Sequence, residues 1–552
     1  MIAVTTAFSP NPAPDHATRE ISPVEPGTSN ARGWIGWRIF SKGLLALAVV
    51  AGSVTSGFAD TALSSDPEAA KAWAEVPKIL ARIVPPVFPK RDFVITTYGA
   101  EEGGKADCTK AFAAAIAECH GAGGGRVVVP KGQFLSGPIH LRSKVELHLS
   151  EGSEVIFSDR FEDYLPVVPV RVGGIDLLNY SPLVYARDCQ DVAVTGKGRL
   201  NGNAGKWWAW KGKEGSGHIK MSADGVPVEK RVFGTPEAGI RPNFLVLLNC
   251  RNVLLEDFTI GSGPNWTIHP VYSENITIRR VTVDTDGPNN DGVDPDSCRD
   301  VLIEHCVFGT GDDCVVLKSG YNEDGWRVAR PTENVIMRHC SSKHGHGGLV
   351  IGSEMSGDVR NVFMHDCEFE GTDRAIRIKS RSGRGGVVEK IYARDIKVKD
   401  MKEEFIILNM DYSADKNAAA SDKLPVFRDM CFERITGEGA PVAIRLSGEA
   451  GSPLRNIRFR DLRLSATEGV VGKNATGLLF ENVGITAAKG PLFNLTDASD
   501  IHLKGIATEG TPEIFLDLKG AGSTGIRIEA SPAAVGPIKL ADEVQGTPVS
   551  VE

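Results

Sequence analysis

The sequence predicts an all-β chain that folds as a single-stranded right-handed parallel β-helix. Three observations carry this prediction. Similar segments recur from residue 252 onward, each unit alternates apolar and polar residues with a period of two, and the composition combines 61 glycines with only 7% aromatic residues. Frequent turns and stacked aliphatic side chains fit this composition better than a helical bundle does.

The recurring segments begin at Asn252, Asn275, Asp300, Asn334 and Asn361, which are 23, 25, 34 and 27 residues apart. This is the period of a solenoid. Each unit has the pattern of a strand, a bend and a second strand. A unit this short cannot bury its apolar face alone, so successive coils must stack in parallel. Leucine-rich repeats are the alternative, but the sequence has no regular L-x-x-L-x-L pattern with an alternating helix.

The chain before the repeats divides into two expected segments. Residues 1–59 are expected to be an export signal with a long polar N-terminal extension, because Arg38 precedes an apolar run over residues 43–50. This run is shorter than the roughly 18 residues of a membrane span. We therefore expect a periplasmic or secreted protein without a lasting membrane anchor. Residues 60–90 are expected to be a linker.

Residues 91–552 are expected to form one β-helix domain. An Ala-rich segment at residues 109–119 predicts a short N-terminal helix that caps the open end of the coils. Short β runs separated by glycine or polar turns follow it directly. The repeat pattern continues past residue 500, and residues 526–528 predict a final partial coil.

Charge and cysteine content narrow the classes of function. The formal charge of −8 argues against a general affinity for nucleic acid, but local cations can still hold a polyanionic substrate. The ten cysteines recur mostly within the repeats, which indicates small apolar fillers of a stacked interior. One disulfide between Cys108 and Cys119 remains open. No cysteine or histidine pair has the spacing of a zinc site, so we expect no metal and no cofactor.

Two acidic motifs interrupt the apolar pattern. The first, residues 289–294, contains Asp291, and the second, residues 311–315, contains Asp312 and Asp313. They lie close to one coil apart, and neighbouring coils are separated by about 4.8 Å. We therefore expect the three carboxylates to meet, where repulsion leaves one protonated and another ionised near neutral pH. Glycoside hydrolysis uses such a pair; a turn or a calcium site is the alternative.

Two further motifs add a histidine and two cations. In residues 343–348, glycines on either side of His346 allow backbone and imidazole to approach a ligand, although a surface loop gives the same pattern. Arg377 and Lys379 stand two apart in an expected strand and therefore share a face. Two cations on one face are disfavoured unless an anion lies between them, and a solvated strand edge is the alternative.

The order and intervals of these four motifs resemble those of the family 28 glycoside hydrolases, the polygalacturonases, and in particular their bacterial exo-acting branch. That family carries Asn-Thr-Asp, Gly- or Gln-Asp-Asp, Gly-His-Gly and Arg-Ile-Lys motifs, which match residues 289–291, 311–313, 345–347 and 377–379. Asn290 stands where the family has threonine. The resemblance covers most of the chain and implies the pectin lyase-like solenoid.

The resemblance implies catalytic roles for four residues. Asp312 is expected to protonate the departing glycosidic oxygen, and Asp291 and Asp313 to activate water. His346 is expected to tune or reprotonate the acid. The family inverts the anomeric centre, so we expect the carboxylate gap to be on the wider scale of roughly 6.5–9.5 Å.

The resemblance also implies substrate contacts. Arg377 and Lys379 are expected to hold the galacturonate carboxylate. Asn289, His269 and Glu354 are further candidates for contacts with the sugar. The alternatives are that His269 supports its strand and that Glu354 faces solvent.

The expected function is hydrolysis of α-1,4-galacturonosyl bonds in polygalacturonate or pectin, with inversion. Residues 321–331 and 352–357 resemble the exo-acting branch, so we expect a monomer that acts from the non-reducing end of an acidic polysaccharide or oligogalacturonide. A rhamnogalacturonan or xylogalacturonan hydrolase on the same fold is one alternative. A pectate lyase would need calcium and an arginine or lysine base. A β-helical adhesin or glycan-binding module is the non-enzymatic alternative.

Overall fold

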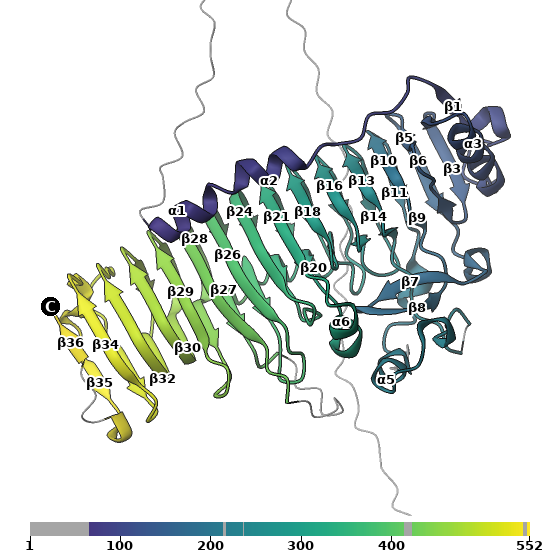
Figure 1. Ribbon diagram of the computed structural model, residues 1–552. Helices are drawn as coiled ribbons and strands as arrows, with labels where there is room; N and C mark the ends of the chain where they lie inside the picture. Colours follow the sequence, from purple (N-terminus) through teal and green to yellow (C-terminus); the bar gives the residue numbers. More distant parts are fainter. Residues whose placement is uncertain (1–65, 214–216, 236, 413–421, 545–548) are drawn as a thin grey trace, which may run out of the picture. The chain divides into compact units, whose positions relative to one another are not determined.

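The computed structural model describes residues 66–213, 217–235, 237–412, 422–544 and 549–552. Within them the chain winds into a parallel β-helix whose coils stack side by side (Figure 1). The predicted fold class is confirmed. The expected export signal, residues 1–59, lies outside the described residues. Among the described residues, no helix is both long enough and apolar enough to cross a membrane.

Each complete coil contributes to three parallel sheets, named here in the order in which the chain enters them. The first sheet contains β1 (Asp92–Val94), β2 (Gly125–Val129), β5 (Val145–Leu149), β10 (Gln190–Gly196), β13 (Arg251–Glu256), β16 (Glu274–Arg279), β18 (Arg299–Glu304) and β21 (Thr332–Arg338). The second contains β3 (Gly132–Ser136), β6 (Ser153–Phe157), β11 (Arg199–Asn201), β14 (Thr259–Gly261), β17 (Thr282–Asp284), β19 (Val307–Gly309) and β22 (Ser341–His344). The third contains β4 (Ile139–His140), β9 (Val184–Arg187), β12 (Leu245–Leu248), β15 (Ile268–Val271), β20 (Asp313–Leu317), β23 (Gly347–Ile351), β25 (Ile376–Lys379) and β27 (Glu404–Asn409).

Five of the later strands, β24, β26, β28, β30 and β32, are longer than the earlier ones and run from one sheet into the next without a break. The strands of this part are β24 (Val359–Glu370), β26 (Val387–Lys399), β28 (Val426–Ser447), β29 (Leu454–Arg460), β30 (Arg463–Glu481), β31 (Gly484–Ala487), β32 (Pro491–Lys504), β33 (Ile514–Lys519), β34 (Thr524–Glu529), β35 (Ile538–Leu540) and β36 (Val549–Val551). The predicted partial coil at residues 526–528 lies in β34, and β36 pairs with it in parallel.

The asparagine or aspartate at the start of each predicted repeat lies in the left-handed region of backbone space. The φ angles are between 55° and 58° at Asn252, Asn275, Asp300, Asn334 and Asn361. Asparagine and aspartate tolerate this region better than other non-glycine residues. Their side chains also bond along the column, since the Nδ2 of Asn275 donates to the Oδ1 of Asn252 at 2.7 Å. The repeat is therefore marked by the residue type that its bend requires.

The interior of the coils is a stack of aliphatic side chains. Val253, Ile276, Val301, Val335 and Val362 occupy one column, one residue per coil, and none has exposed surface. Full burial of a side chain of this size stabilises the fold by about 1.5–3 kcal/mol. Because each coil needs its neighbours to bury this column, the stack behaves as one cooperative unit.

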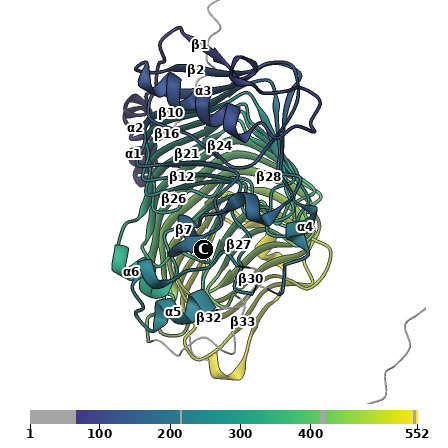
Figure 2. The same ribbon diagram turned by 90° about the vertical axis from the view of Figure 1, so that its right-hand side faces the viewer.

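A helix covers the N-terminal end of the stack, as predicted. This helix, α3 (Thr109–Gly121), lies across the first coils (Figure 2). Its buried residues Phe112, Ala115 and Ile116 belong to the same apolar cluster as the interior of the coils. Without this cover, the first coil would expose its apolar interior to water.

Residues 67–82, which the sequence analysis assigned to a linker, form two short helices. These are α1 (Pro67–Trp73) and α2 (Val76–Arg82), which lie along the first sheet (Figure 1). Trp73 packs against Phe363 with ring centroids 5.3 Å apart. Their buried residues follow one another at helical spacing, a periodicity that predicts an amphipathic segment rather than a linker.

The cysteines are buried and free. Cys108 precedes the first turn of α3 and Cys119 lies in its last turns. Eleven residues of helix separate them by about 16 Å along the axis, far more than the Cα separation that a disulfide permits. The disulfide left open by the sequence is therefore absent from the structure.

Candidate active site

The three aspartates of the acidic motifs lie together, as predicted. Asp291 and Asp313 stand at the start of third-sheet segments on neighbouring coils, where the Gly292 amide donates to the Asp313 carbonyl at 2.9 Å. One carboxylate oxygen from each of Asp291, Asp312 and Asp313 lies within 4.8 Å of the other two. Asp291 and Asp313 are buried, whereas 19% of the Asp312 side chain is exposed. Asp312 is therefore the most accessible of the three carboxylates.

The separation of these oxygens is smaller than the expected gap of roughly 6.5–9.5 Å, although it joins the nearest oxygens rather than the centres of the carboxyl groups. A water that accepts or donates two hydrogen bonds of about 2.8 Å at a near-tetrahedral angle joins oxygens about 4.6 Å apart. The site thus has room for one bridging water. The separation itself gives no support to inversion.

The carboxylate of Asp312 is held by His346, by Asn289 and by the amide of Asp313, which donates at 3.0 Å. The Nδ1 atom of His346 lies 3.0 Å from one of its oxygens, and the Nδ2 of Asn289 donates to the other at 3.3 Å. Arg241 in turn donates to the Oδ1 of Asn289 at 3.0 Å, which fixes the orientation of the amide. His346 leaves 47% of its side chain exposed, so the pair is open to solvent on the histidine side.

Asn290 has a structural role. Its side chain is fully buried and its Nδ2 donates to the carbonyls of Gly263 and Asn265, both at 3.0 Å. Its Oδ1 accepts from the hydroxyl of Thr285. Asn290, which stands where the family has threonine, therefore anchors the catalytic turn to the preceding coil. The carboxylates remain in place.

The predicted pair of cations meets the aspartates. The Nζ of Lys379 donates to Asp313 at 2.7 Å, and the Nη1 of Arg377 lies 3.7 Å from the other Asp313 oxygen. Both cations also lie over the ring of Tyr412, each 5.1 Å from its centroid. The sequence analysis predicted an anion near these two cations. In the structure, the carboxylate of Asp313 is one such anion.

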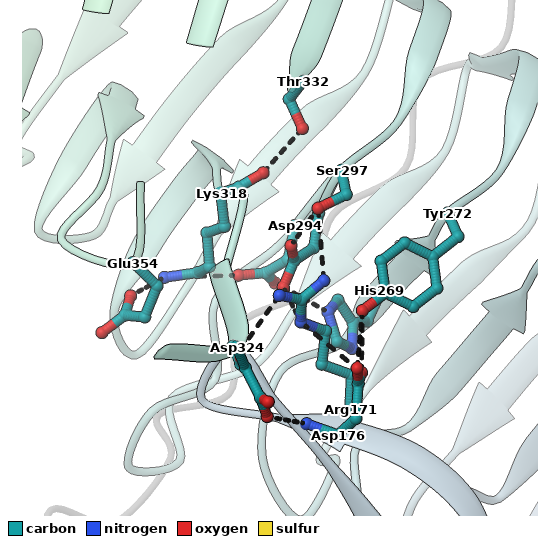
Figure 3. A network of polar contacts seen from close by, with 12 residues as sticks. Arg171, Asp176, His269, Tyr272, Asp294, Ser297, Lys318, Asp324, Thr332 and Glu354 are labelled. Atoms are coloured by element: carbon teal, nitrogen blue, oxygen red, sulfur yellow. Dashed lines mark hydrogen bonds and ion pairs between the residues drawn. The ribbon is translucent and has the colours of Figure 1, made fainter. Parts of the chain in front are cut away.

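A lysine that the sequence analysis did not single out lies beneath this cluster. Figure 3 shows the ammonium group of Lys318 between Asp294 and Glu354. Its Nζ lies 3.9 Å from Asp291, 4.0 Å from Asp294 and 3.1 Å from Glu354, and 4.2 Å from the ring centroid of Trp266. Only 4% of its side chain is exposed. Lys318 is the buried countercharge that lets these carboxylates stand so close together.

Glu354 takes up the other side of this lysine. Its carboxylate accepts hydrogen bonds from Lys318 and, at 3.1 Å, from the hydroxyl of Ser353, and it lies 3.9 Å from Arg384. Burial acts against ionisation, but the charges of Lys318 and Arg384 outweigh it and hold the pKa of Glu354 at about 2. With 18% of its side chain exposed, Glu354 presents an anion at the edge of the site.

His269 does not reach the surface, which corrects its place among the sugar-contacting candidates. Its side chain has no exposed area, and its Nδ1 lies 2.8 Å from the amide of Asn243. Its Nε2 faces Asp296 at 3.8 Å, in the network of Figure 3. Burial lowers the pKa of His269. The arrangement agrees with the alternative that His269 supports its strand.

The carboxyl groups of the site differ in their tendency to hold a proton. Burial, followed by the charges of Asp294 and Asp312, raises the pKa of Asp291. Burial also acts on Asp312, but its hydrogen bond to His346 and the charge of Lys379 outweigh it and hold its pKa at about 2. The same hydrogen bond raises the pKa of His346. The environment of Asp291 thus favours a proton more than that of Asp312, which favours the ionised carboxylate.

Three carboxylates at this spacing are also a donor set for a divalent cation. However, Lys318 and Lys379 already place ammonium groups 3.9 Å from Asp291 and 2.7 Å from Asp313. These ammonium groups already compensate the negative charge of the carboxylates, as a bound metal ion would. The described residues therefore fit an acid–base site better than a cation site.

Several elements leave the coils. The antiparallel hairpin β7 (Val168–Val172) and β8 (Ile175–Asn179), together with α5 (Gly217–Ala223) and α6 (Asn322–Val328), lies on the side of Glu354, where Arg384 joins Ser353 to Asn322 of α6. The short helix α4 (Gly205–Trp208) lies away from them (Figure 2). The hairpin, α5 and α6 lie together outside the coils (Figure 1). Here we call them the wall.

Buried ion pairs and hydrogen bonds fasten the wall to the coils and hold its parts together. Arg171 of the hairpin is fully buried and lies 3.3 Å from Asp296. Asp324 of α6 accepts from Arg231 at 2.6 Å and from the amide of Asp176 at 2.9 Å. Tyr272 donates to Asp176 at 2.8 Å (Figure 3). Removing one partner of such a pair leaves a buried charge, so the wall is a fixed part of the structure.

Sequence reasoning missed four contributors to the site: Lys318, Arg241, Tyr412 and the hairpin arginine Arg171. Lys318 had a usable signal, because it follows an uninterrupted apolar strand, residues 314–317, where a charged side chain needs a partner. Arg241 and Tyr412 come from loops without a repeat pattern. No local signal identifies them.

Comparison with known proteins agrees with this geometry. A family model described as "Glycosyl hydrolases family 28" matches residues 119–488. A probable polygalacturonase of Vitis vinifera is 30% identical over 375 residues, which cover 66% of this chain and 72% of that protein. An exo-poly-alpha-D-galacturonosidase of Dickeya chrysanthemi is 26% identical over 399 residues, which cover 66% of this chain and 65% of that protein.

Solved structures give the same result. The hyperthermoactive exopolygalacturonase of Thermotoga maritima is 40% identical and superposes with a TM-score of 0.69, covering 76% of this chain and 96% of that one. A family 28 exopolygalacturonase of Yersinia enterocolitica, at 21% identity and a TM-score of 0.63, shares the fold. The family resemblance predicted from four motifs is confirmed: the chain belongs to the glycosyl hydrolases of family 28 and is a glycoside hydrolase.

Proposed function

We propose that this enzyme hydrolyses α-1,4-galacturonosyl bonds of polygalacturonate or pectin from the non-reducing end, with inversion. The observation that carries the proposal is the meeting of three aspartates with Arg377 and Lys379. The carboxylates supply acid–base chemistry, and the cations favour a sugar that itself bears a carboxylate. The relatives named as polygalacturonases support the same substrate.

Asp312 is the proposed general acid, because it is the exposed carboxyl of the three and its neighbour His346 can resupply a proton across 3.0 Å. In the free protein its pKa is low, partly because of the charge of Lys379. A uronate carboxylate that pairs with Lys379 and Arg377 would weaken this effect and raise the pKa. Substrate binding thus moves the proton from His346 to Asp312, where the leaving oxygen needs it.

Asp291 and Asp313 are the proposed activators of water. They sit deeper than Asp312 and each has an oxygen within 4.8 Å of one of its oxygens, so a water that they hold would lie close to the acid. The uronate charge that frees Asp312 from Lys379 also loosens the bond between Lys379 and Asp313. A carboxylate released from its salt bridge is a better acceptor for a proton from water.

Action from the chain end is supported by the wall, which stands next to Glu354 and is fastened by buried ion pairs. The exo-acting names of the relatives from Dickeya and Thermotoga point in the same direction. The test is product analysis of polygalacturonate digests over time. We expect galacturonate or digalacturonate from the first minutes, while the polymer length falls slowly. An early ladder of intermediate oligomers would contradict exo action.

Inversion is tested separately. Proton NMR during the first turnovers distinguishes a β-configured product, which inversion of an α bond gives, from an α-configured one. We further propose that the protein is exported to the periplasm or the medium, based on the N-terminal signal pattern in residues 1–59. We also propose that it is a monomer. N-terminal sequencing of the protein recovered from these fractions, together with light scattering, tests this.

A further inference from the structure

We propose that Glu354 recognises the free 4-hydroxyl group of the non-reducing terminal sugar, and thereby makes the enzyme specific for chain ends. This inference rests on the proposed function and names the group that distinguishes a terminal sugar from an internal one. At an internal residue, O4 belongs to a glycosidic bond and cannot donate a hydrogen bond. At the chain end it is a hydroxyl that donates one.

The carboxylate of Glu354 can accept a further hydrogen bond from a substrate hydroxyl. Lys318 donates to one oxygen at 3.1 Å and Ser353 to the other at 3.1 Å, while Arg384 lies 3.9 Å away. A carboxylate offers about four acceptor positions, so these contacts leave capacity for a substrate donor. Because two cations hold it, Glu354 remains ionised and accepts rather than donates.

The position of Glu354 fits a contact with the sugar on the non-reducing side of the cleaved bond. Lys318 contacts both Glu354 and Asp291, at 3.1 and 3.9 Å, so a single ammonium group joins it to the catalytic cluster. On its other side, Arg384 binds Ser353 and Asn322 at 3.3 and 2.9 Å. Asn322 opens α6, which belongs to the wall. Glu354 therefore stands between the reacting carboxylates and the wall.

The charge of Glu354 also orients the sugar. A uronate carboxylate is repelled by Glu354 and attracted by Arg377 and Lys379 on the next coil. The uronate carboxylates of the bound chain are thus expected to lie toward the cations, and Glu354 to face a hydroxyl edge of the terminal sugar. An internal sugar would place an ether oxygen against an ionised carboxylate, with no hydrogen to share, and this mismatch is unfavourable.

The test compares trigalacturonate with its analogue that carries a 4-deoxy terminal sugar at the non-reducing end. For the wild-type enzyme we expect kcat/KM to be at least ~10-fold lower on the deoxy substrate, since a hydrogen bond to a charged acceptor is lost. In Glu354→Gln we expect activity on trigalacturonate to fall by about the same factor and the ratio between the two substrates to approach one. Glu370→Gln, an exposed glutamate of the second sheet, is the matched control and should keep the wild-type ratio.

Each outcome separates the inference from the proposed function. If the wild-type enzyme cleaves neither substrate, the proposed function fails. Equal cleavage of both substrates by the wild type overturns end recognition and leaves galacturonan hydrolysis in place, and so does a Glu354→Gln variant that keeps the wild-type ratio. Should Glu354→Gln fail to fold, Glu354→Asp retains the charge but withdraws it by one methylene, and it must also lose discrimination. A purely structural Glu354 would change yield and melting temperature without changing this ratio.

Discussion

The coils that carry the active site and the coils that follow residue 426 share one pattern of strand pairing but differ in what they bury. In the catalytic coils, the third sheet buries Asp294, Asp313 and Lys318. On the same sheet of the later coils, the buried carboxylate of Asp517 pairs at 2.8 Å with Lys519, whose side chain is 40% exposed. Desolvation of charges costs several kcal/mol per ion even when they are paired.

The interior of the later coils shows the opposite trend. Phe432, Phe459 and Phe480 stack one above another with centroids 5.4 and 4.8 Å apart. Aromatic pairs of this kind add about 0.5–1.5 kcal/mol beyond the burial of their area. In register with Phe432, the earlier coils have Ala393 and Met364. Coils of one repeat can therefore serve different purposes. Some concentrate the charges that chemistry needs, and others concentrate apolar contacts that stabilise the stack.

Asp312→Asn should give the largest effect and should act on chemistry alone. The substitution keeps the shape of the side chain but removes the proposed acid, so kcat should fall by roughly 10³-fold or more. Reducing-sugar release from polygalacturonate measures this, and a thermal melt should show a nearly unchanged midpoint. Asp284→Asn, an exposed second-sheet aspartate, is the control. Substantial activity in Asp312→Asn would refute the assignment of the acid.

Phe459→Ala should act on stability alone. Removal of the central ring of the stack should lower the free energy of unfolding by about 3–5 kcal/mol, with kcat of the folded protein within about two-fold of the wild-type value. Urea unfolding followed by circular dichroism measures the loss. Leu479→Ala, which truncates a partly exposed side chain of β30, should cost less than half as much. If Phe459→Ala abolished activity while remaining folded, the separation of the two regions would be wrong.

His346→Gln should reduce activity less than Asp312→Asn does, and it should change the pH profile. The hydrogen bond to Asp312 raises the pKa of His346, so its proton is present below its ordinary pKa of about 6.5 and is lost as the pH rises through the raised value. Activity should fall in the same alkaline range.

The glutamine variant should be about 10- to 100-fold slower and should lack this alkaline limb. Profiles of kcat/KM between about pH 4 and pH 9 test it. The stability linked to this pair should also decline with rising pH, but only slightly, because His346 is half exposed. A variant that kept the wild-type alkaline limb would remove His346 from the proton path.

Much of the site was predictable, because its residues sit at fixed places in the repeat. Asp291 and Asp312 differ by 21 residues, near one coil, so parallel stacking brings them together whatever the details of the bends. Arg377 and Lys379 share a face for the same geometric reason. The residues that escaped prediction depend on packing between segments far apart in the chain. Arg171 meets Asp296 across 125 positions of sequence, and the alternation of a strand carries no information on that contact.

The roles of some individual side chains also depended on packing rather than on the repeat. His269 was a candidate for a sugar contact, but the coils bury it behind the catalytic segment. The low pKa of Asp312 follows from the position of His346 and Lys379 in space, and residues 67–82 are helical because they pack on the first sheet.

By itself, the sequence determined the repeat, the stacking of coils and the family. The recurring asparagine or aspartate residues, the alternating apolar residues and the four short motifs are all local features, which a solenoid presents at defined places in its coils. The tertiary structure decided which groups are buried, which carboxyl favours a proton and where the wall lies. Those properties depend on distances between charges and on exclusion of water, and both arise only when loops and coils of unequal length pack against one another.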